Sequence, residues 1–374
     1  MITNRRWILA GLGATGLSAC AGGGSAPASR TQYRAVPNAA FDAWLDGFRG
    51  RAAANGVSGA TIDRAFRSAG YLPEVIERDR NQTEFRRSLE DYLALTANDD
   101  KVAQGRQMMS RYNGVLSQIE ARYGVEKEIV VAIWGIESQY GTRRGDVPVV
   151  SSTATLAYDG RRRALFEKQL VAAMKILQAG DVSPEGMVGS WAGAMGHTQF
   201  IPTSYLAFAV DFNGDGRRDI WSDDPTDSLA STAAYLDRNG WRFGQPWMVE
   251  ALPGTSGGSV IQPQQPGPSF RTYANFGTIK TYNNSTSYAL AVSYLANRVA
   301  GGAPLRTPFG PDAGGLTLAD RQELQQRLTR AGYDTGGTDG VIGPKSIAAI
   351  EAYQRANGLP VTGQGTAAML AGLR

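Results

Sequence analysis

The sequence predicts a mainly α-helical protein made of a large N-terminal unit and a small C-terminal unit. From Phe41 to about residue 240, apolar residues recur at spacings of three and four, the period of a helix packed on one face. The apolar run YALAVSYLANRV (288–299) and two stretches near the C-terminus, 317–331 and 345–357, follow the same period. The segment FGTIKTYNNS (276–285) has some strand character instead.

Segments rich in glycine, proline and serine interrupt the helical pattern. Residues 21–37, 253–269 and 301–315 lack apolar periodicity, as expected for tethers, loops and linkers. These breaks predict five parts in chain order: a signal segment at 1–19, a flexible tether at 20–38, the large unit at 39–300, a linker at 301–315 and the small unit at 316–374.

The N-terminus has the features of an export signal. Arg5 and Arg6 precede a short apolar run that ends in the string Leu-Ser-Ala-Cys at Cys20. This string resembles the lipobox of bacterial lipoproteins, which implies cleavage before Cys20 and lipid attachment to its thiol. The resemblance places the protein in the bacterial envelope, facing the periplasm, and Ala21 favours the outer membrane. The alternative is an ordinary signal peptide with an incidental cysteine.

Composition excludes several classes of enzyme and partner. Cys20 is the only cysteine and His197 the only histidine, so the chain cannot form an internal disulfide or a Cys/His zinc site. A Ser–His–Asp triad would depend on His197 alone. The net charge is only +4 and arginines are spread along the chain, so no nucleic-acid partner is expected.

One carboxylate stands inside a strongly apolar helix, in the stretch VVAIWGIESQYG (130–141). Apolar residues surround most of the circumference of this predicted helix, so it should be buried and should end near Gly141. A buried carboxyl such as Glu137 pairs with a partner, takes up a proton or faces a cleft. Glu137 is therefore either a core residue bonded to a neighbouring helix or arginine, or a general acid.

Two further segments extend the pattern: SWAGAMGHTQFIPTSY (190–205), the second motif, and TYNNSTSYALAV (281–292), the third motif. With the stretch around Glu137, they resemble the MltB-type family of lytic murein transglycosylases over about residues 40–300. The resemblance implies a mostly helical, lysozyme-like catalytic domain. It also implies that Glu137 is the single catalytic acid and base. The substrate-binding residues that it implies are Ser190, Gln199, Tyr282, Asn283, Tyr288 and, by spacing alone, Tyr92.

Each of these positions also has a purely structural interpretation. Ser190 could be a helix N-cap, and Asn283 could be a turn residue. Tyr282 and Tyr288 could serve as cleft wall and core at once. His197 lies within the second motif, but we expect it to be scaffold or cleft rim.

The resemblance implies cleavage of the MurNAc–GlcNAc bond of peptidoglycan with formation of 1,6-anhydro-MurNAc ends. One carboxylate suffices if the substrate supplies the second group, so no metal or organic cofactor is expected in the chemistry. Two alternatives remain, a hydrolytic muramidase and a non-catalytic wall-binding lipoprotein. Thr281 stands where the family usually has a basic residue.

A candidate calcium loop begins at residue 211 with the pattern D-x-N-x-D-G. The oxygen donors expected there are the side chains of Asp211, Asn213 and Asp215 and the carbonyl of Arg217. Position twelve is Ser222 instead of the usual glutamate, so Asp227 is the candidate closing ligand. An ion here would be structural, and the alternatives are an Asx-rich turn without metal and, more remotely, a calcium sensor.

The C-terminal unit resembles the peptidoglycan-binding type 1 domain, a three-helix module. The resemblance rests on the turn GTDGVIGPKS (337–346), with Ser346 where threonine is usual, and on flanking helices with apolar faces. The expected partners are therefore peptidoglycan glycan strands and, through the N-terminal lipid, a membrane. Partners in cell-wall enzyme complexes are left open.

Overall fold

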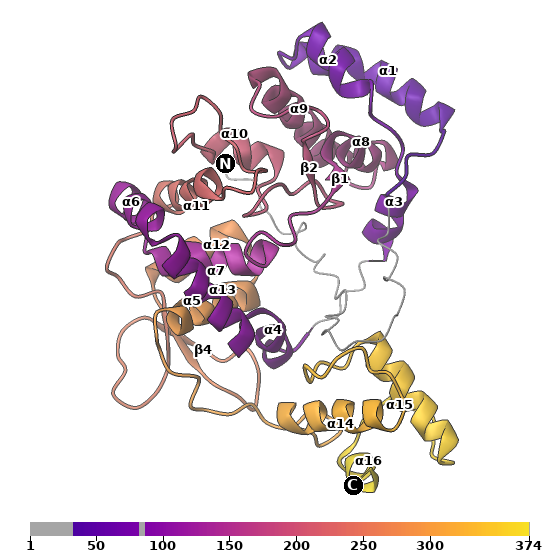
Figure 1. Cartoon of the computed structure of the whole chain (residues 1–374), viewed down its shortest axis with the longest axis vertical. Coiled ribbons are helices and arrows are strands. Elements are labelled where there is room, and N and C mark those ends of the chain that lie inside the picture. The colour runs from indigo at the N-terminus through magenta and orange to yellow at the C-terminus, as the bar shows by residue number, and fades with distance from the viewer. Residues whose placement is uncertain (1–32, 82–86, 374) are drawn as a thin grey trace.

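The computed structural model describes residues 33–81 and 87–373 and confirms a mainly helical protein (Figure 1). The signal segment, the acylation candidate Cys20 and most of the 20–38 tether lie outside the described residues. In the described part of the chain, no helix is both long and apolar enough to cross a membrane.

Helices α1 to α13 make up most of the large unit. Their bounds are α1 Ala39–Ala54, α2 Gly59–Phe66, α3 Pro73–Arg80, α4 Leu89–Thr96, α5 Asp99–Arg111, α6 Asn113–Tyr123, α7 Lys127–Ser138, α8 Val149–Asp159, α9 Arg163–Ala179, α10 Pro202–Phe208, α11 Thr226–Arg238, α12 Ala274–Tyr282 and α13 Thr286–Val299.

Two small antiparallel sheets complete this unit. In the first, β1 (Val147–Pro148) pairs with β2 (Val188–Gly189). In the second, β5 (Phe270–Thr272) lies between β3 (Met248–Glu250) and β4 (Ser259–Ile261). The second sheet corrects the interpretation of 253–269 as loop alone, because β4 lies within it.

The strand character expected for residues 276–285 is wrong, because this segment forms most of α12. The buried residues Phe276, Ile279 and Tyr282 recur every three positions and place one helical face on the core. Tertiary packing on this face decides the conformation and overrides the local strand character.

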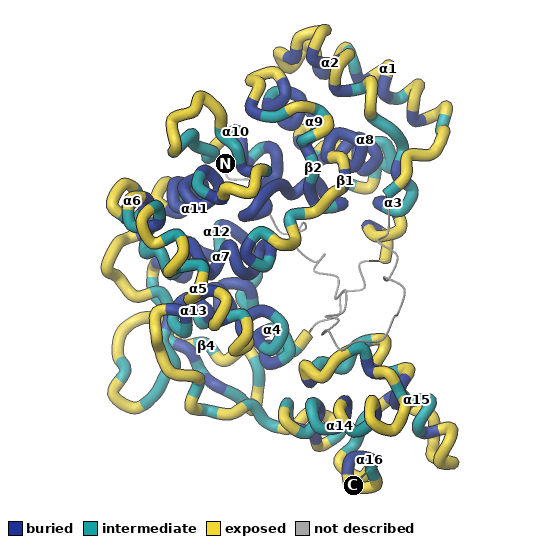
Figure 2. Tube along the Cα trace, in the orientation of Figure 1, coloured by how far each residue is buried: buried dark blue, intermediate teal, exposed yellow. Residues whose placement is uncertain are grey.

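Helix α7 runs through the centre of the large unit, where it packs against α5, α11 and α13 (Figure 2). Every residue from Ile129 to Ser138 is buried, as expected for a helix that is apolar on all sides. The helix ends at Ser138, earlier than Gly141, because Gln139 and Tyr140 both adopt left-handed backbone with φ of 52° and 53°.

The small unit contains three helices within the described residues, which confirms the predicted three-helix module: α14 (Leu318–Arg330), α15 (Pro344–Ala356) and α16 (Ala367–Gly372). It has its own apolar cluster, separate from the core around α7, made of Leu316, Leu324, Leu328, Ile350, Met369 and Leu370. The chain between the two units runs along the second sheet. There, the Glu250 carboxylate accepts backbone N–H bonds from Arg306 and Thr307 at 2.8 Å each.

Candidate active site

The centre of the candidate site is Glu137, which lies in the last turn of α7 and is 5% exposed. The Tyr288 hydroxyl, on the neighbouring helix α13, donates a hydrogen bond to Glu137 Oε1 at 2.7 Å. Burial raises the pKa of the Tyr288 phenol well above its ordinary value, and the charge of Glu137 raises it further. Tyr288 therefore keeps its proton and is a permanent donor to the carboxylate.

Tyr92, on α4, lies in the electrostatic neighbourhood of Glu137. Burial raises the pKa of its phenol, and the negative charge of Glu137 contributes to the same shift. Helix α4 packs against α13, the helix that carries Tyr288. The structure thus brings Tyr92, Tyr288 and Glu137 together from helices that are far apart in the sequence.

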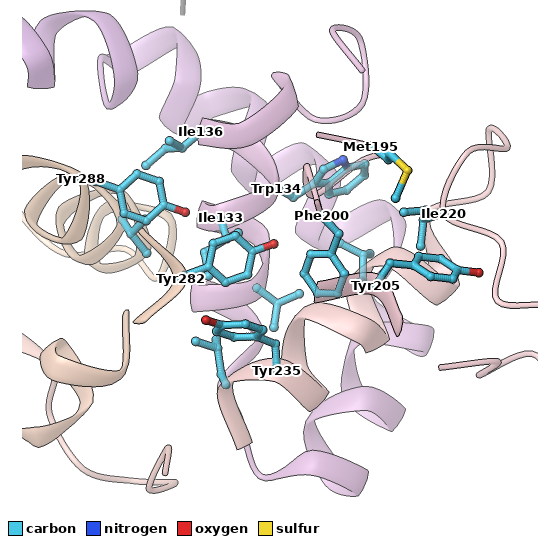
Figure 3. Packing of buried hydrophobic residues seen from close by; sticks show 14 of the residues in the cluster. Ile133, Trp134, Ile136, Met195, Phe200, Tyr205, Ile220, Tyr235, Tyr282 and Tyr288 are labelled. Carbon is cyan, nitrogen blue, oxygen red and sulfur yellow. The ribbon is translucent and has the colours of Figure 1, made fainter. Parts of the chain in front are cut away.

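Tyr282 is placed differently from the expectation. Its side chain is fully buried, and its hydroxyl donates to the Thr198 carbonyl at 2.6 Å. Figure 3 shows its ring beside Phe200 and Tyr235, with centroid distances of 5.9 and 4.9 Å. Tyr282 therefore fastens the third motif to the second, and its hydroxyl is engaged by the backbone instead of reaching a sugar.

Gln199 has an unusual backbone, with φ of 53°, in the left-handed region that non-glycine residues rarely adopt. Its amide nitrogen donates to the carbonyls of Arg144 and Gly196 at 2.9 Å each, and the side chain is 7% exposed. The conformation is held by these bonds, so the position of the side chain is fixed by the surrounding loops.

Ser190 follows β2 and stands at a turn. Its hydroxyl accepts the Ala194 backbone N–H at 3.1 Å, and its own N–H donates to the Ala194 carbonyl at 2.7 Å. No helix begins here in the described chain, so the N-cap alternative is wrong. Gly145 packs against this turn, because a Cβ atom added at residue 145 would lie 2.7 Å from the Ser190 backbone nitrogen.

Asn283 ends α12 and is 9% exposed. Its carbonyl accepts the N–H of Ser285 at 2.7 Å, and Ser285 is the N-cap of α13. The backbone of Asn283 therefore forms the short connection between α12 and α13, which agrees with the turn interpretation. The turn also places Asn283 one residue after Tyr282 and just ahead of the helix that carries Tyr288.

His197 connects the second motif to α7. Trp134 Nε1 donates to His197 Nδ1 at 3.1 Å, and the Ser138 hydroxyl donates to the His197 carbonyl. The side chain is 3% exposed, which agrees with the scaffold interpretation. Because Ser138 follows Glu137 directly, these bonds fix the end of α7 against the second motif.

The contacts of the imidazole define its protonation. Because Nδ1 accepts from Trp134, the ring proton is on Nε2, which lies 2.8 Å from the Ser222 carbonyl. Burial lowers the pKa of His197; the bond to Ser222 raises it, and the adjacent Arg144 guanidinium lowers it. His197 is therefore a neutral structural residue and not a proton carrier for the site.

Lys101, which sequence reasoning missed, also supports the end of α7. Its Nζ donates to the Gly135 carbonyl at 3.1 Å, and its carbonyl accepts from the Tyr140 hydroxyl at 2.8 Å. Burial, with a smaller contribution from Arg143, lowers the pKa of Lys101 to about 8. Lys101 lies on α5, and no local pattern in the sequence indicates that it reaches α7.

The candidate calcium loop is closed by Asp227 through the backbone. Its Oδ1 accepts the N–H groups of Phe212 and Asn213 at 2.9 and 3.3 Å, and its Oδ2 accepts that of Asp219 at 2.9 Å. Asp227 is 2% exposed, and burial raises its pKa. Both oxygens thus bond the backbone of the loop itself, and the expected role of closing metal ligand stays a prediction.

The remaining donors lie on the exposed part of the loop. The Asp211 carboxylate accepts the backbone N–H groups of Gly214 and Gly216 at 2.7 and 2.9 Å. Asn213 Nδ2 donates to Asp215 Oδ2 at 3.5 Å. Among the residues that the structure describes, no three His, Cys, Asp or Glu side chains form a group that could hold a metal ion. The oxygen donors at Asp211, Asn213, Asp215 and the Arg217 carbonyl are of the kind that Ca²⁺ prefers.

The chain that carries the three motifs and Glu137 matches models of known protein families. The model described as "Transglycosylase SLT domain" matches residues 40–259 and 253–297. The chain belongs to this transglycosylase family. A second model, described as "Putative peptidoglycan binding domain", matches residues 317–373 of this family member.

Solved and curated relatives agree with this membership. SltB3 from Pseudomonas aeruginosa, crystallised with NAG-anhNAM-pentapeptide, is 42% identical, and the match covers 90% of this transglycosylase-family chain and 100% of that chain, with a TM-score of 0.70. Slt35 from Escherichia coli, crystallised with calcium, is 28% identical over 70% of this chain and 93% of that chain, with a TM-score of 0.58.

Among curated proteins, membrane-bound lytic murein transglycosylase B from Escherichia coli K12 is 35% identical to this chain over 234 residues. That match covers 54% of this chain, which spans 64% of the length of the relative.

Proposed function

We propose that this protein is a lytic transglycosylase that cleaves the MurNAc–GlcNAc bond of peptidoglycan and leaves 1,6-anhydro-MurNAc ends. The observation that carries the proposal is the buried Glu137 carboxyl, held by Tyr288 within a chain of the transglycosylase family. The complex of the relative SltB3 with an anhydro-muropeptide supports the same product class.

In the first step, Glu137 acts as general acid. Because the Tyr288 hydroxyl donates to Oε1, the proton of the neutral carboxyl belongs on Oε2, which delivers it to the glycosidic oxygen. The bond between MurNAc C1 and that oxygen breaks, and GlcNAc leaves with a new hydroxyl. The N-acetyl group of MurNAc stabilises the positive charge at C1, so no second carboxylate is needed.

In the second step, the ionised Glu137 acts as general base. It takes the proton of the MurNAc C6 hydroxyl while that oxygen bonds to C1, which forms the anhydro ring and restores the acid. The Tyr288 donor stabilises the carboxylate between the two steps, as a charge-assisted hydrogen bond. No metal or cofactor is assigned to this chemistry.

We assign the remaining polar groups to the sugar. Ser190, Gln199, Asn283 and Tyr92 would contact the glycan, and Tyr282 would hold the wall behind them. Gln199 and Asn283 keep 7% and 9% of their surface exposed, which supports a position where a sugar can reach them. Tyr282 has no exposed surface. These contacts would orient the N-acetyl and leaving groups by hydrogen bonding.

Residues 39–300 would be the catalytic domain and 316–374 the wall-binding domain, joined by the segment 301–315. The match of residues 317–373 to a peptidoglycan-binding model supports this division. We propose that the protein is located in the bacterial envelope, where a lipid on Cys20 anchors it to the outer membrane and the folded chain lies in the periplasm. The name of the E. coli relative, which includes "membrane-bound", supports a membrane anchor.

A structural Ca²⁺ is the one ion that we propose. Asp211, Asn213, Asp215 and the Arg217 carbonyl would hold it, while Asp227 fixes the loop through its backbone bonds. The calcium complex of the relative Slt35 supports this assignment.

Product analysis tests the proposed activity. The protein is incubated with purified sacculi, and the soluble fragments are examined by mass spectrometry. Anhydro ends, lighter than reducing ends by one water, are the expected product. Reducing ends would indicate a muramidase, and sacculus binding without soluble fragments would indicate a non-catalytic binder. Glu137→Gln should abolish release, and a variant with unchanged release would overturn the assignment.

A further inference from the structure

One arginine joins the C-terminal module to the catalytic unit. Arg321, on α14, is 4% exposed, and its Nη2 donates to Glu90 Oε2 at 2.8 Å and to Asp91 Oδ1 at 2.9 Å. Both carboxylates lie in the first turn of α4, more than 200 residues earlier in the chain. Figure 1 shows α14 below α4, on the side of the C-terminal module that faces the large unit.

The remaining donors of Arg321 bind its own module and the end of the segment that precedes it. Nε donates to the Gly340 carbonyl at 2.7 Å, and Nη1 donates to the Leu316 carbonyl and to Asp312 at 3.3 and 3.4 Å. The planar guanidinium is thus used on all sides, which a lysine could not reproduce. Arg321 holds the turn at residue 340 and the first turn of α4 in one fixed relationship.

The first turn of α4 is also fixed from its own side. The Glu90 side chain is almost as buried as Arg321, with 7% of the residue exposed. Its backbone N–H donates to Gln264 Oε1 at 3.0 Å, and the Ser88 hydroxyl caps the helix by accepting the Asp91 N–H. A buried arginine–carboxylate group that is this fully bonded loses most when one partner is removed.

This turn directly precedes Tyr92, the residue of α4 whose phenol pKa is raised by burial and by the charge of Glu137. Leu89 and Leu93 fix the same helix in the core, where α4 packs against α13 and its Tyr288. A shift of the Glu90–Asp91 turn would therefore move Tyr92, the next residue of the same eight-residue helix, relative to Tyr288 on α13 and to the Glu137 carboxylate that Tyr288 bonds.

We propose that Arg321 is a positioning residue of the candidate active site: it docks the C-terminal module onto α4 and thereby fixes Tyr92 beside Glu137. The inference rests on the proposed function and extends it, because the module then contributes to turnover as well as to wall binding. Removal of the Arg321 guanidinium should lower kcat even on a soluble substrate that does not need wall binding.

The test compares Arg321→Met with Arg327→Met in the full chain. Arg327 lies on the same helix but bonds Glu323 and the Leu373 carbonyl within the module, so it controls for loss of a cationic side chain. The substrate is the soluble tetrasaccharide GlcNAc-MurNAc-GlcNAc-MurNAc. Arg321→Met should lower kcat about tenfold with little change in KM, whereas Arg327→Met should stay within about twofold of the unmodified protein.

A double-mutant cycle with Tyr92→Phe separates positioning from general stability. If Arg321 acts through Tyr92, Arg321→Met should cost less than about twofold in kcat when Tyr92 is already phenylalanine. Equal losses in both backgrounds would overturn the proposal, as would a loss confined to whole sacculi. Arg321→Lys, which keeps the charge without the fork, should lie between the unmodified protein and Arg321→Met.

Hydrogen exchange gives a readout that does not depend on activity. Amides of residues 89–97 should exchange faster in Arg321→Met and in Glu90→Gln than in Arg327→Met, and unchanged exchange there would overturn the proposal. If the unmodified protein releases no anhydro products, the proposed function fails and the exchange result alone decides the positioning role. Glu90→Gln also replaces Arg321→Met if that variant does not fold.

Discussion

The Tyr288 hydroxyl and Glu137 Oε1 stand 2.7 Å apart, although their residues are separated by 151 positions. Both side chains are buried, and their bond joins α7 to α13, the helix that contains the second part of the third motif. In the proposed reaction, this bond acts mainly on the charged form of Glu137, because a carboxylate accepts more strongly than a neutral carboxyl.

The variant Tyr288→Phe should keep the fold and lose most of the activity. The ring still fills its place, but the carboxylate formed after the first step loses a donor, which corresponds to about 1.5–3 kcal/mol or roughly ten- to a hundredfold in kcat. Release of anhydro products from sacculi measures the effect. Tyr294→Phe, on the same helix, removes a hydroxyl that bonds Arg298 and should leave the rate unchanged. A normal rate in Tyr288→Phe would contradict this role.

His197 should make the fold less stable in mild acid. Burial lowers its pKa in the folded protein, so between that value and the unfolded value of about 6.5 the unfolded chain binds more protons. The contribution of neutral His197 is therefore present above about pH 6.5 and is lost as pH falls below it. Tm measured from about pH 8 to about pH 5 should fall more steeply for the unmodified protein than for His197→Gln. Parallel curves would contradict the assignment, because the charges around the ring, Arg144 and Asp223, are the same in both proteins.

Gly145→Ala should be far more damaging than Gly240→Ala. Both glycines have left-handed backbone, with φ of 85° and 89°, so both substitutions carry a conformational cost of about 1–2 kcal/mol. A Cβ at Gly145 would also stand 2.3 Å from the Gly189 carbonyl oxygen, whereas one at Gly240 meets no atom within 4 Å. Urea unfolding should show an additional loss of about 2 kcal/mol or more for Gly145→Ala. Equal losses would show that the backbone beneath Ser190 can move.

Calcium should raise the thermal stability of the protein if the 211–217 loop binds it. A protein treated with EDTA and then supplied with CaCl₂ should unfold at higher temperature, and Asp215→Asn should reduce that gain. The matched control is Asp224→Asn, a nearby carboxylate that bonds Thr226 and is not a proposed ligand. An identical Tm with EDTA and with CaCl₂ would exclude the site.

The sequence predicts the parts of the structure that depend on local pattern. The all-round apolar character of the stretch near Glu137 indicates a buried helix, and α7 is buried from Ile129 to Ser138. Apolar spacing predicts two helices of the C-terminal module, and the third is implied by the resemblance of its turn to a known three-helix domain. Strand character at 276–285 is a wrong prediction because the contacts that make α12 a helix, such as that of Phe276, come from the distant core.

The relationships around the candidate site depend on tertiary contacts, and no local signal contains them. Resemblance to a family indicates Glu137 and Tyr288, but not that one bonds the other. Tyr282 is expected at the sugar, yet its hydroxyl is bonded to Thr198 because α12 packs directly on the second motif. The bond from Arg321 to Glu90 spans 231 positions and two domains, so a composition-based linker prediction could not indicate it.

The bonds of Glu250 to the backbone of Arg306 and Thr307 limit how far the C-terminal module can move from the large unit. A free segment of fifteen residues could extend by about 50 Å and let a bound domain sample a wide area of wall. Here the segment follows the large unit, so in the proposed function the fold sets the distance between the wall-binding module and the candidate active site. Inserting residues between 307 and 316 would lengthen the chain without widening that area until the docked contacts were broken.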